Sequence, residues 1–248
     1  MSTPREYRRF AHKGANFRIC SDRFDAAAAE IVRQREALEQ YLRRHRAFGE
    51  SFEPVDALPD APDVARRMAR AAAAAGVGPM AAVAGAMAQM AAEAAIAAGA
   101  AEAIVENGGD LFLICGRPVV VGLYAGRTPL SDRLALRVGP EETPLAICSS
   151  SSRMGHSISL GDCDLATVAA ADGSLADAAA TAAANRVRSA DDIAATLAAM
   201  KGIAGVAGVL LVKGDRMGLA GRLGELVANR DPELTVKVTR DRRSGPAR

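Results

Sequence analysis

Two oxygen-bearing side chains in the second half of the chain have a spacing that could bind a metal ion. Asp177 and Thr181 occur in LADAAATAAANRV, residues 175–187. Residues four apart on an α-helix lie on one face, about one turn from each other. Mg²⁺ prefers hard oxygen ligands, and it commonly takes one or two protein carboxylates and leaves its other positions to water and phosphate. The pair therefore predicts a magnesium site on a helix.

A glycine-rich turn forms the second polar segment, in VENGGDLFL, residues 105–113. Asn107 and Gly108 lie between two apolar runs, which is the strongest short-range signal for a β-hairpin. Glycine at 108 and 109 lets backbone N–H groups approach an anionic group without a Cβ in the way. Asp110 follows directly. We expect a hairpin turn that faces a ligand.

A run of serines forms the third segment, followed closely by a histidine, in ICSSSSRMGHS. The run comprises Ser149, Ser150, Ser151 and Ser152. Serine hydroxyls are adaptable donors that suit phosphate oxygens, and we expect a loop here. His156 is a candidate acid or base.

Each of these features also has an ordinary structural explanation. An Asn-Gly pair alone is more often only a turn, and the serines alone are a polar loop. His156 alone is more often a structural histidine. Asp177 could be a solvated acid in a first helical turn, and Thr181 could bond the carbonyl four residues before it.

The order of the segments resembles a family allied to the ApbE-type FAD:protein FMN transferases. The resemblance runs from GVGPMAAVAGA through NGGD and SSSS to LADAAATAAANRV, about residues 75–190. In those transferases an Asn-x-Gly-Gly-Asp turn, a Ser-Thr-Ser-Gly-like loop, a following His and an Ala-Asp-Ala-x-Ala-Thr helix surround FAD pyrophosphate and Mg²⁺. Here no residue separates Asn107 from the two glycines.

The resemblance implies roles for the residues that match. The turn from Asn107 to Asp110 and the four serines would bind FAD or another flavin nucleotide. Asp177 and Thr181 would hold Mg²⁺, and Asp177 and His156 would act in cleavage or transfer at the pyrophosphate, with a protein as a possible acceptor. Ala84 stands where the transferases usually carry the lysine of an Ala-Lys-Gly segment, and the Asp-Pro that follows their histidine is absent.

Three functions are compatible with these features. The first is a magnesium-dependent enzyme acting on a flavin or related dinucleotide. The second is a non-catalytic carrier of a flavin or nucleotide. The third is a relative in fold only, with an unrelated substrate or a role in assembly. For the first, we expect Asp177 to be surface-accessible, so that its replacement with alanine leaves the fold nearly intact.

The elements that must position these residues are helices mixed with mostly adjacent strands. We expect a hairpin at the start, a helix over about 25–47, helices at 63–75 and 80–98, and two more at 174–187 and 190–201. Strands are expected at 103–106, 110–115, 118–124, 134–138, 146–149, 157–160, 164–170, 208–214 and 233–239.

This pattern predicts an α+β protein of ApbE-like fold, with mixed sheets, packed helices and two subdomains sharing one core. We expect one domain over 1–248, with a strand and helix subregion over about 1–60 and the motif-bearing core over about 62–220.

One segment, residues 71–101, is nearly all alanine, glycine and other apolar residues, with only Gln89 and Glu93 polar. We interpret it as a buried helix and expect no membrane span, because alanine and glycine gain little from lipid and Pro79 would break the segment near its start. Small residues such as Gly85 would let another backbone approach closely, as in a helix packed beneath a sheet. The same helix makes a homodimer plausible.

Composition excludes some partners and indicates a compartment. A net charge of +2, six Phe, three Tyr and no Trp argue against nucleic-acid binding. The four cysteines lack CxxC spacing, and the N-terminus lacks the apolar stretch of a signal peptide, so we expect reduced thiols in the cytoplasm. The expected partner is a small-molecule nucleotide.

Overall fold

The structure is a computed structural model that describes residues 4–126, 128–131, 133–152 and 161–230. The strands expected at 157–160 and 233–239 and the candidate base His156 lie outside the described residues.

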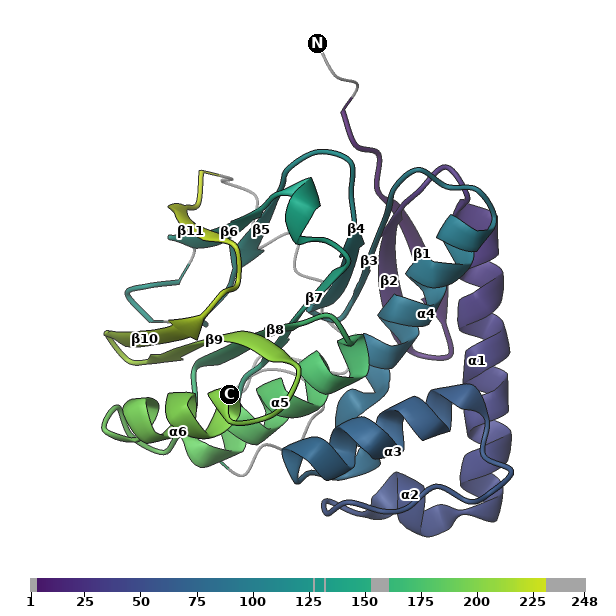
Figure 1. The fold of residues 1–248 in the computed structure, drawn as a ribbon, viewed down its shortest axis with the longest axis horizontal. Coiled ribbons are helices and arrows are strands. Elements are labelled where there is room, and N and C mark those ends of the chain that lie inside the picture. The colour runs from purple at the N-terminus through teal and green to yellow at the C-terminus, as the bar shows by residue number, and fades with distance from the viewer. Residues whose placement is uncertain (1–3, 127, 132, 153–160, 231–248) are drawn as a thin grey trace.

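The described chain forms two antiparallel sheets. The larger sheet has the strand order β1-β2-β3-β4-β7-β8-β9-β10, and the smaller has the order β11-β6-β5. The strands of the larger sheet are β1 (Arg8–His12), β2 (Ala15–Cys20), β3 (Ala103–Asn107), β4 (Asp110–Ile114), β7 (Leu145–Ser150), β8 (Leu165–Ala170), β9 (Val206–Lys213) and β10 (Arg216–Gly221). Those of the smaller sheet are β5 (Val119–Leu123), β6 (Leu134–Val138) and β11 (Glu225–Ala228). Figure 1 shows the helices on one face of the larger sheet and the smaller sheet on the other.

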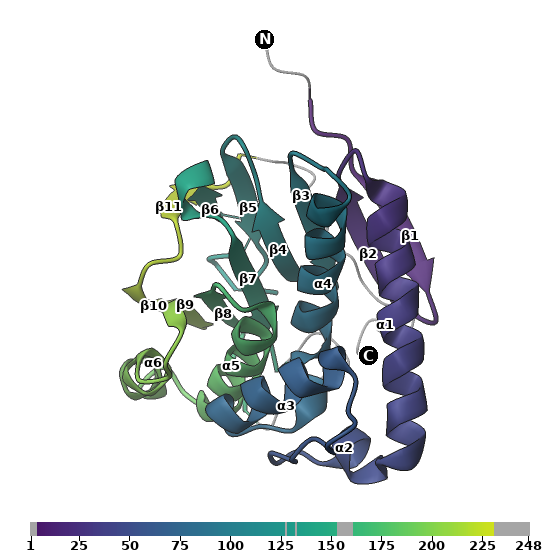
Figure 2. The same cartoon turned by 45° about the vertical axis from the view of Figure 1, so that its right-hand side comes forward.

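The helices form a layer over the sheet and a second layer outside it. The helices are α1 (Phe24–Arg44), α2 (Arg46–Glu50), α3 (Asp63–Ala75), α4 (Val83–Ala97), α5 (Gly173–Arg186) and α6 (Asp192–Lys201), with short 3-10 helices η1 (Pro79–Ala82) and η2 (Pro140–Glu142). Helix α4 packs on β3 and β4, α5 on β7 and β8, and α6 on β9 and β10. Helix α3 packs across α5 and α4 rather than on the sheet, as the turned view in Figure 2 shows.

The central strands are buried on both faces, and this accounts for their unbroken apolar sequences. Val105 of β3 and Phe112 of β4 are paired and belong to the hydrophobic cluster beneath the helices. Ile104 and Leu113, one position along, belong to a second cluster between the two sheets. Because successive side chains point to opposite faces, each strand contributes to both clusters.

Helix α4 lies inside the protein. The stretch Pro79–Ala97 is the one segment of the described residues that is long and apolar enough to cross a membrane, and 50% of it is buried in the protein. It contacts α1, α5, β3 and β4, as a core helix does. The small residue Gly85 does permit a close backbone approach, but the backbone that approaches is that of α5 and not of the sheet.

The predicted α+β fold is confirmed, and two details of the prediction are wrong. The helix expected over about 25–47 is divided at His45 into α1 and α2. The edge strands β10 and β11 were missed, because most of their side chains are exposed and β10 contains glycine.

Candidate functional site

The turn at residues 107–110 is a two-residue hairpin that joins β3 to β4. Asn107 pairs with Asp110, and the two residues between them have φ of 66° at Gly108 and 107° at Gly109. Positive φ at both central residues is what a type I′ turn requires. A Cβ placed on either glycine would meet nothing within 4 Å. The expected turn is confirmed, and the space around its two glycines is open.

Asn107 of this turn and Asp177 of α5 both contact the N-terminus of α4. Asn107 Nδ2 donates to the carbonyl oxygen of Ala84 at 3.4 Å. Asp177 Oδ2 accepts the N–H of Gly85 at 2.9 Å, and its carboxylate also accepts from the N–H of Ala84. Ala82, which precedes α4, supplies no capping side chain. Asp177 of α5 therefore caps α4 from a different helix.

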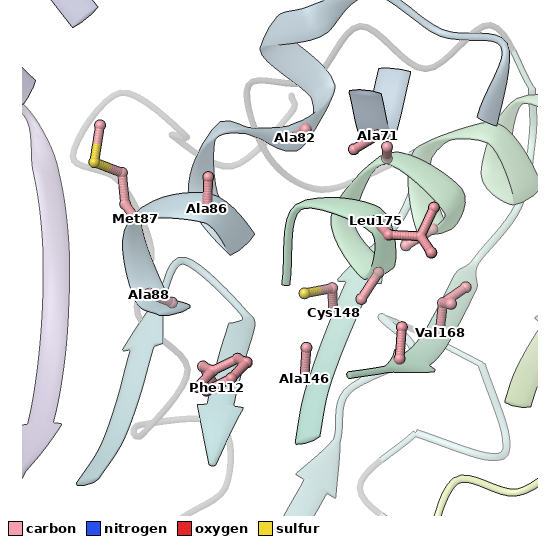
Figure 3. Packing of buried hydrophobic residues seen from close by; sticks show 14 of the residues in the cluster. Ala71, Ala82, Ala86, Met87, Ala88, Phe112, Ala146, Cys148, Val168 and Leu175 are labelled. Atoms are coloured by element: carbon pink, nitrogen blue, oxygen red, sulfur yellow. The ribbon is translucent and has the colours of Figure 1, made fainter. Parts of the chain in front are cut away.

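Helices α4 and α5 touch through their backbones at this point. A Cβ on Gly85 would lie 2.0 Å from the carbonyl oxygen of Gly173, and a Cβ on Gly173 would lie 2.6 Å from the carbonyl oxygen of Gly85. Figure 3 shows the neighbourhood, with Cys148 of β7 beside the first turn of α5. Only glycine at both positions allows the contact that brings Asp177 to α4.

Two buried carboxylates meet in this region. Burial raises the pKa of Asp177 to about 7, although the N–H groups of Gly85 and Ala84 oppose the shift. Burial also raises the pKa of Asp110 well above its usual value, and the nearby charge of Asp177 adds to that increase. The N–H of Ser149 donates to Asp110 Oδ1 at 3.1 Å. The two acids together form a buried pair in which the loss of both protons is unfavourable.

A buried cysteine, Cys148, belongs to the same cluster. The Cys148 thiol hydrogen-bonds to Asp110, and its sulfur lies 3.7 Å from the carbonyl oxygen of Gly173. Burial, with the charges of Asp110 and Asp177, raises the pKa of this thiol well above its usual value. Cys148 is therefore a neutral thiol that packs against the acids, not a nucleophile.

The serine run is mostly strand, so the expected loop is wrong for Ser149 and Ser150, which end β7. The Ser149 hydroxyl lies 2.9 Å from the Thr167 hydroxyl, on the face toward the small sheet. Ser151 is buried, and Ser152 Oγ accepts the N–H of Cys163 at 3.0 Å. Ser149 contacts the acid pair through its backbone N–H, which donates to Asp110.

Helix α5 is buried on nearly every side, which corrects the expectation that Asp177 is surface-accessible. Asp177 is 9% exposed and Thr181 is 6% exposed. The described residues include no group of three or more His, Cys, Asp or Glu side chains that could hold a metal ion. Any cation at this site would therefore take few charged protein ligands.

Several residues of the site were not assigned a role from the sequence. Gln89 accepts the N–H of Gly173 at 2.7 Å, and Glu106 accepts the N–H of Gly109 at 2.9 Å. Gln89 stood out as a polar residue in an apolar helix, which was a usable signal. Nothing in the sequence distinguished Cys148, because its role follows from strand register.

Solved structures of known proteins share this fold. The flavinyl transferase ApbE of Pseudomonas stutzeri, in its apo form, superposes with a TM-score of 0.52 at 12% identity, covering 88% of this chain and 94% of that one. The ApbE protein of Thermotoga maritima gives 0.54 at 14% identity, covering 87% and 96%. At this identity the likeness shows the ApbE fold.

Sequence relatives give the family. The AbpE bacteria family matches over residues 7–204, and this chain belongs to it. A UPF0280 protein of Methanocella arvoryzae is 48% identical over 208 residues, which is 84% of each chain. A UPF0280 protein of Methanocaldococcus jannaschii is 38% identical over 218 residues, covering 86% of this chain and 88% of that one.

Proposed function

We propose that this protein binds FAD or a related flavin nucleotide together with Mg²⁺ and cleaves or transfers at the pyrophosphate. The observation that carries the proposal is the buried pair Asp110 and Asp177 at the N-terminus of α4. Burial is the main influence on both pKa values, the charges of Asp177 and Glu106 add to the increase at Asp110, and hydrogen bonds oppose both shifts. Two buried acids without a cationic side chain are stabilised by protons or by a metal cation.

The donor set fits a hard cation. Asp177 and Thr181 would hold Mg²⁺, since both are buried oxygen ligands one turn apart on α5. Magnesium uses one or two carboxylates and completes its shell with water and phosphate oxygens, which agrees with the few charged ligands here. Bound there, the ion would neutralise charge as a phosphoanhydride breaks and AMP leaves.

The phosphates would lie over the hairpin turn. The space around Gly108 and Gly109 is open, and positive φ presents backbone to it without side chains. Asn107 fixes the turn to Ala84, and the backbone of Ser149 fixes Asp110.

We propose that the turn and the serines contact the nucleotide, and that His156 acts with Asp177 in the chemistry. The relationship to ApbE flavin transferases supports the choice of ligand.

The first test is to mix the purified protein with FAD, with and without Mg²⁺. Flavin fluorescence reports binding, and chromatography reports AMP release. We expect both to depend on Mg²⁺ and to be lost in Asp177→Asn, which keeps the shape of the side chain. Asp192→Asn is the control, because Asp192, at the start of α6, also accepts two backbone N–H groups, those of Arg188 and Ser189. Magnesium-independent behaviour of the wild type would refute the proposal.

A non-catalytic carrier is the second candidate, and one observation favours it. Ala84, at the centre of the site, stands where the flavin transferases usually carry a lysine, so one cation that could contact phosphate is missing. Magnesium-dependent FAD binding without AMP release would support the carrier. If AMP is released, mass spectrometry of the reaction with candidate proteins would show whether a protein accepts the remaining flavin phosphate.

We also propose a cytoplasmic location and a homodimer. The four free, buried cysteines support a reducing compartment. Gly85, one of the small residues of α4 that first pointed to a dimer, contacts α5 within the chain. Exposed Met217 and Leu219 on β10, at the edge of the large sheet, are better support for self-association. Light scattering after size exclusion would measure the mass directly.

A further inference from the structure

Gln89 joins α4 to the first turn of α5 with both ends of its amide. Its Oε1 accepts the N–H of Gly173 at 2.7 Å, and its Nε2 donates to Glu93 Oε1 at 2.8 Å. An amide oxygen can only accept and an amide nitrogen can only donate, so this pair of partners fixes the orientation of the group.

The same two helices are joined a second time by Asp177. Gly85 and Gln89 are four residues apart on α4, and Gly173 and Asp177 are four apart on α5, so each pair lies on one helix face. The N–H of Gly85 is bonded to Asp177, and the N–H of Gly173 is bonded to Gln89. The two bonds form consecutive rungs between the helices, and the backbone contact of the glycines lies at the same crossing.

From Gln89, a series of charged side chains leads through Glu93 to α3. Glu93 pairs with Arg67 at 3.0 Å, and Arg67 pairs with Asp63 at 3.0 Å. Both partners of Glu93 are thus outside α5, on α4 and α3. Glu93 and Arg67 thus support the amide group of Gln89 through contacts that do not involve Asp110 or Asp177.

We propose that Gln89 is a positioning residue for Asp177. By fixing the first turn of α5 against α4, it sets the orientation of the Asp177 carboxylate and thereby the affinity of the site for Mg²⁺. Residues that orient a metal ligand without touching the metal commonly change metal affinity by about 10- to 100-fold when they are replaced. The inference rests on the proposed function, in which Asp177 binds the ion.

The test measures the Mg²⁺ concentration that gives half-maximal FAD binding, alongside the melting temperature. Gln89→Leu removes both hydrogen bonds, and we expect it to raise that concentration at least about tenfold while saturating Mg²⁺ restores binding. The double variant Gln89→Glu with Glu93→Gln exchanges acceptor and donor, so both bonds can re-form. It should return to within about twofold of the wild type. Should Gln89→Leu fail to fold, Gln89→Asn, which is one methylene too short to reach, is expected to show the same weakening.

The outcomes separate this inference from the proposed function. A lower melting temperature with an unchanged Mg²⁺ requirement in the Gln89 variants would reduce Gln89 to a structural residue and overturn the inference. The same would follow if the exchanged pair bound Mg²⁺ as weakly as Gln89→Leu. If instead Asp177→Asn binds FAD with the wild-type Mg²⁺ requirement, the proposed function itself fails.

Discussion

The hairpin turn and the helix crossing each use two glycines to hold one aspartate, but for different physical reasons. At the turn, Gly108 and Gly109 have positive φ and open space around them. At the crossing, neither Gly85 nor Gly173 has positive φ, and a Cβ on either would collide with the backbone of the other helix. The turn needs glycine for its conformation, whereas the crossing needs it for space.

The difference shows how the two acids of the site are placed. Asp110 follows a turn whose geometry is set by two adjacent residues, so its position is a local property of the chain. Asp177 reaches α4 only because two helices that are far apart in sequence touch at their backbones. The position of Asp177 therefore depends on tertiary packing, and changes at the crossing should affect the protein more than changes at the turn.

The largest effect is expected from Gly85→Ala. The added Cβ would lie 2.0 Å from a backbone oxygen, which cannot move aside as a flexible side chain can. We expect the free energy of unfolding to fall by about 3 kcal/mol or more, as measured by urea denaturation. Gly116→Ala is the control, because nothing lies within 4 Å of its Cβ position. Equal stability of the two variants would contradict the close crossing.

A smaller loss is expected from Asp177→Ala. The change leaves the N–H groups of Gly85 and Ala84 without their acceptor, and an unsatisfied buried donor costs about 1–3 kcal/mol. Asp177→Asn keeps an oxygen that can accept, so it should lose less. Thermal unfolding of both variants without divalent cations measures the difference. A wild-type melting temperature for the alanine variant would show that the cap contributes little.

At the turn, Gly108→Val should cost about 1–2 kcal/mol, because a β-branched residue adopts positive φ poorly. Space is not limiting there, so Gly108→Asn should fold with near wild-type stability, since asparagine tolerates this conformation. Denaturation curves of the two variants make the comparison. If Asn is as damaging as Val, the turn is limited by space after all and its contrast with the crossing disappears.

The last prediction concerns the pH dependence of stability. With a folded-state pKa of about 7 against an ordinary 3.8, Asp177 binds its proton more tightly in the folded state. Its contribution to the free energy of unfolding therefore falls as pH rises from about 4 to 7 and is constant above that. Paired surface acids such as Glu39, whose pKa is lowered, act in the opposite direction at acid pH.

Comparing the wild type with Asp177→Asn in metal-free buffer measures this contribution together with the effect of the Asp177 charge on Asp110. The stability of the wild type relative to the variant should decrease across that pH window. A constant difference from pH 4 to 8 would mean that Asp177 titrates normally, and that it is less buried than the crossing requires.

Much of the fold could be predicted from the sequence, because its signals are local. The Asn-Gly pair predicted the β3–β4 hairpin, and apolar runs between turn residues predicted most strands. Strand β10 was not predictable in this way, since its residues are exposed and contain glycine. The serine run was predicted as a loop from composition, but pairing with β8 extends β7 through Ser150. Strand pairing outweighed local polarity there.

For the site, the sequence by itself determined which residue types are present and how they are spaced: a glycine turn before Asp110, and Asp177 and Thr181 one helical turn apart. Only the tertiary structure decided that Asp177 is buried, that it caps α4, and that it lies near Asp110. The physical reason is that spacing along a chain fixes which residues share a face of one element. Burial, capping and charge interaction depend on which elements meet, and here they depend on a glycine contact between residues 85 and 173.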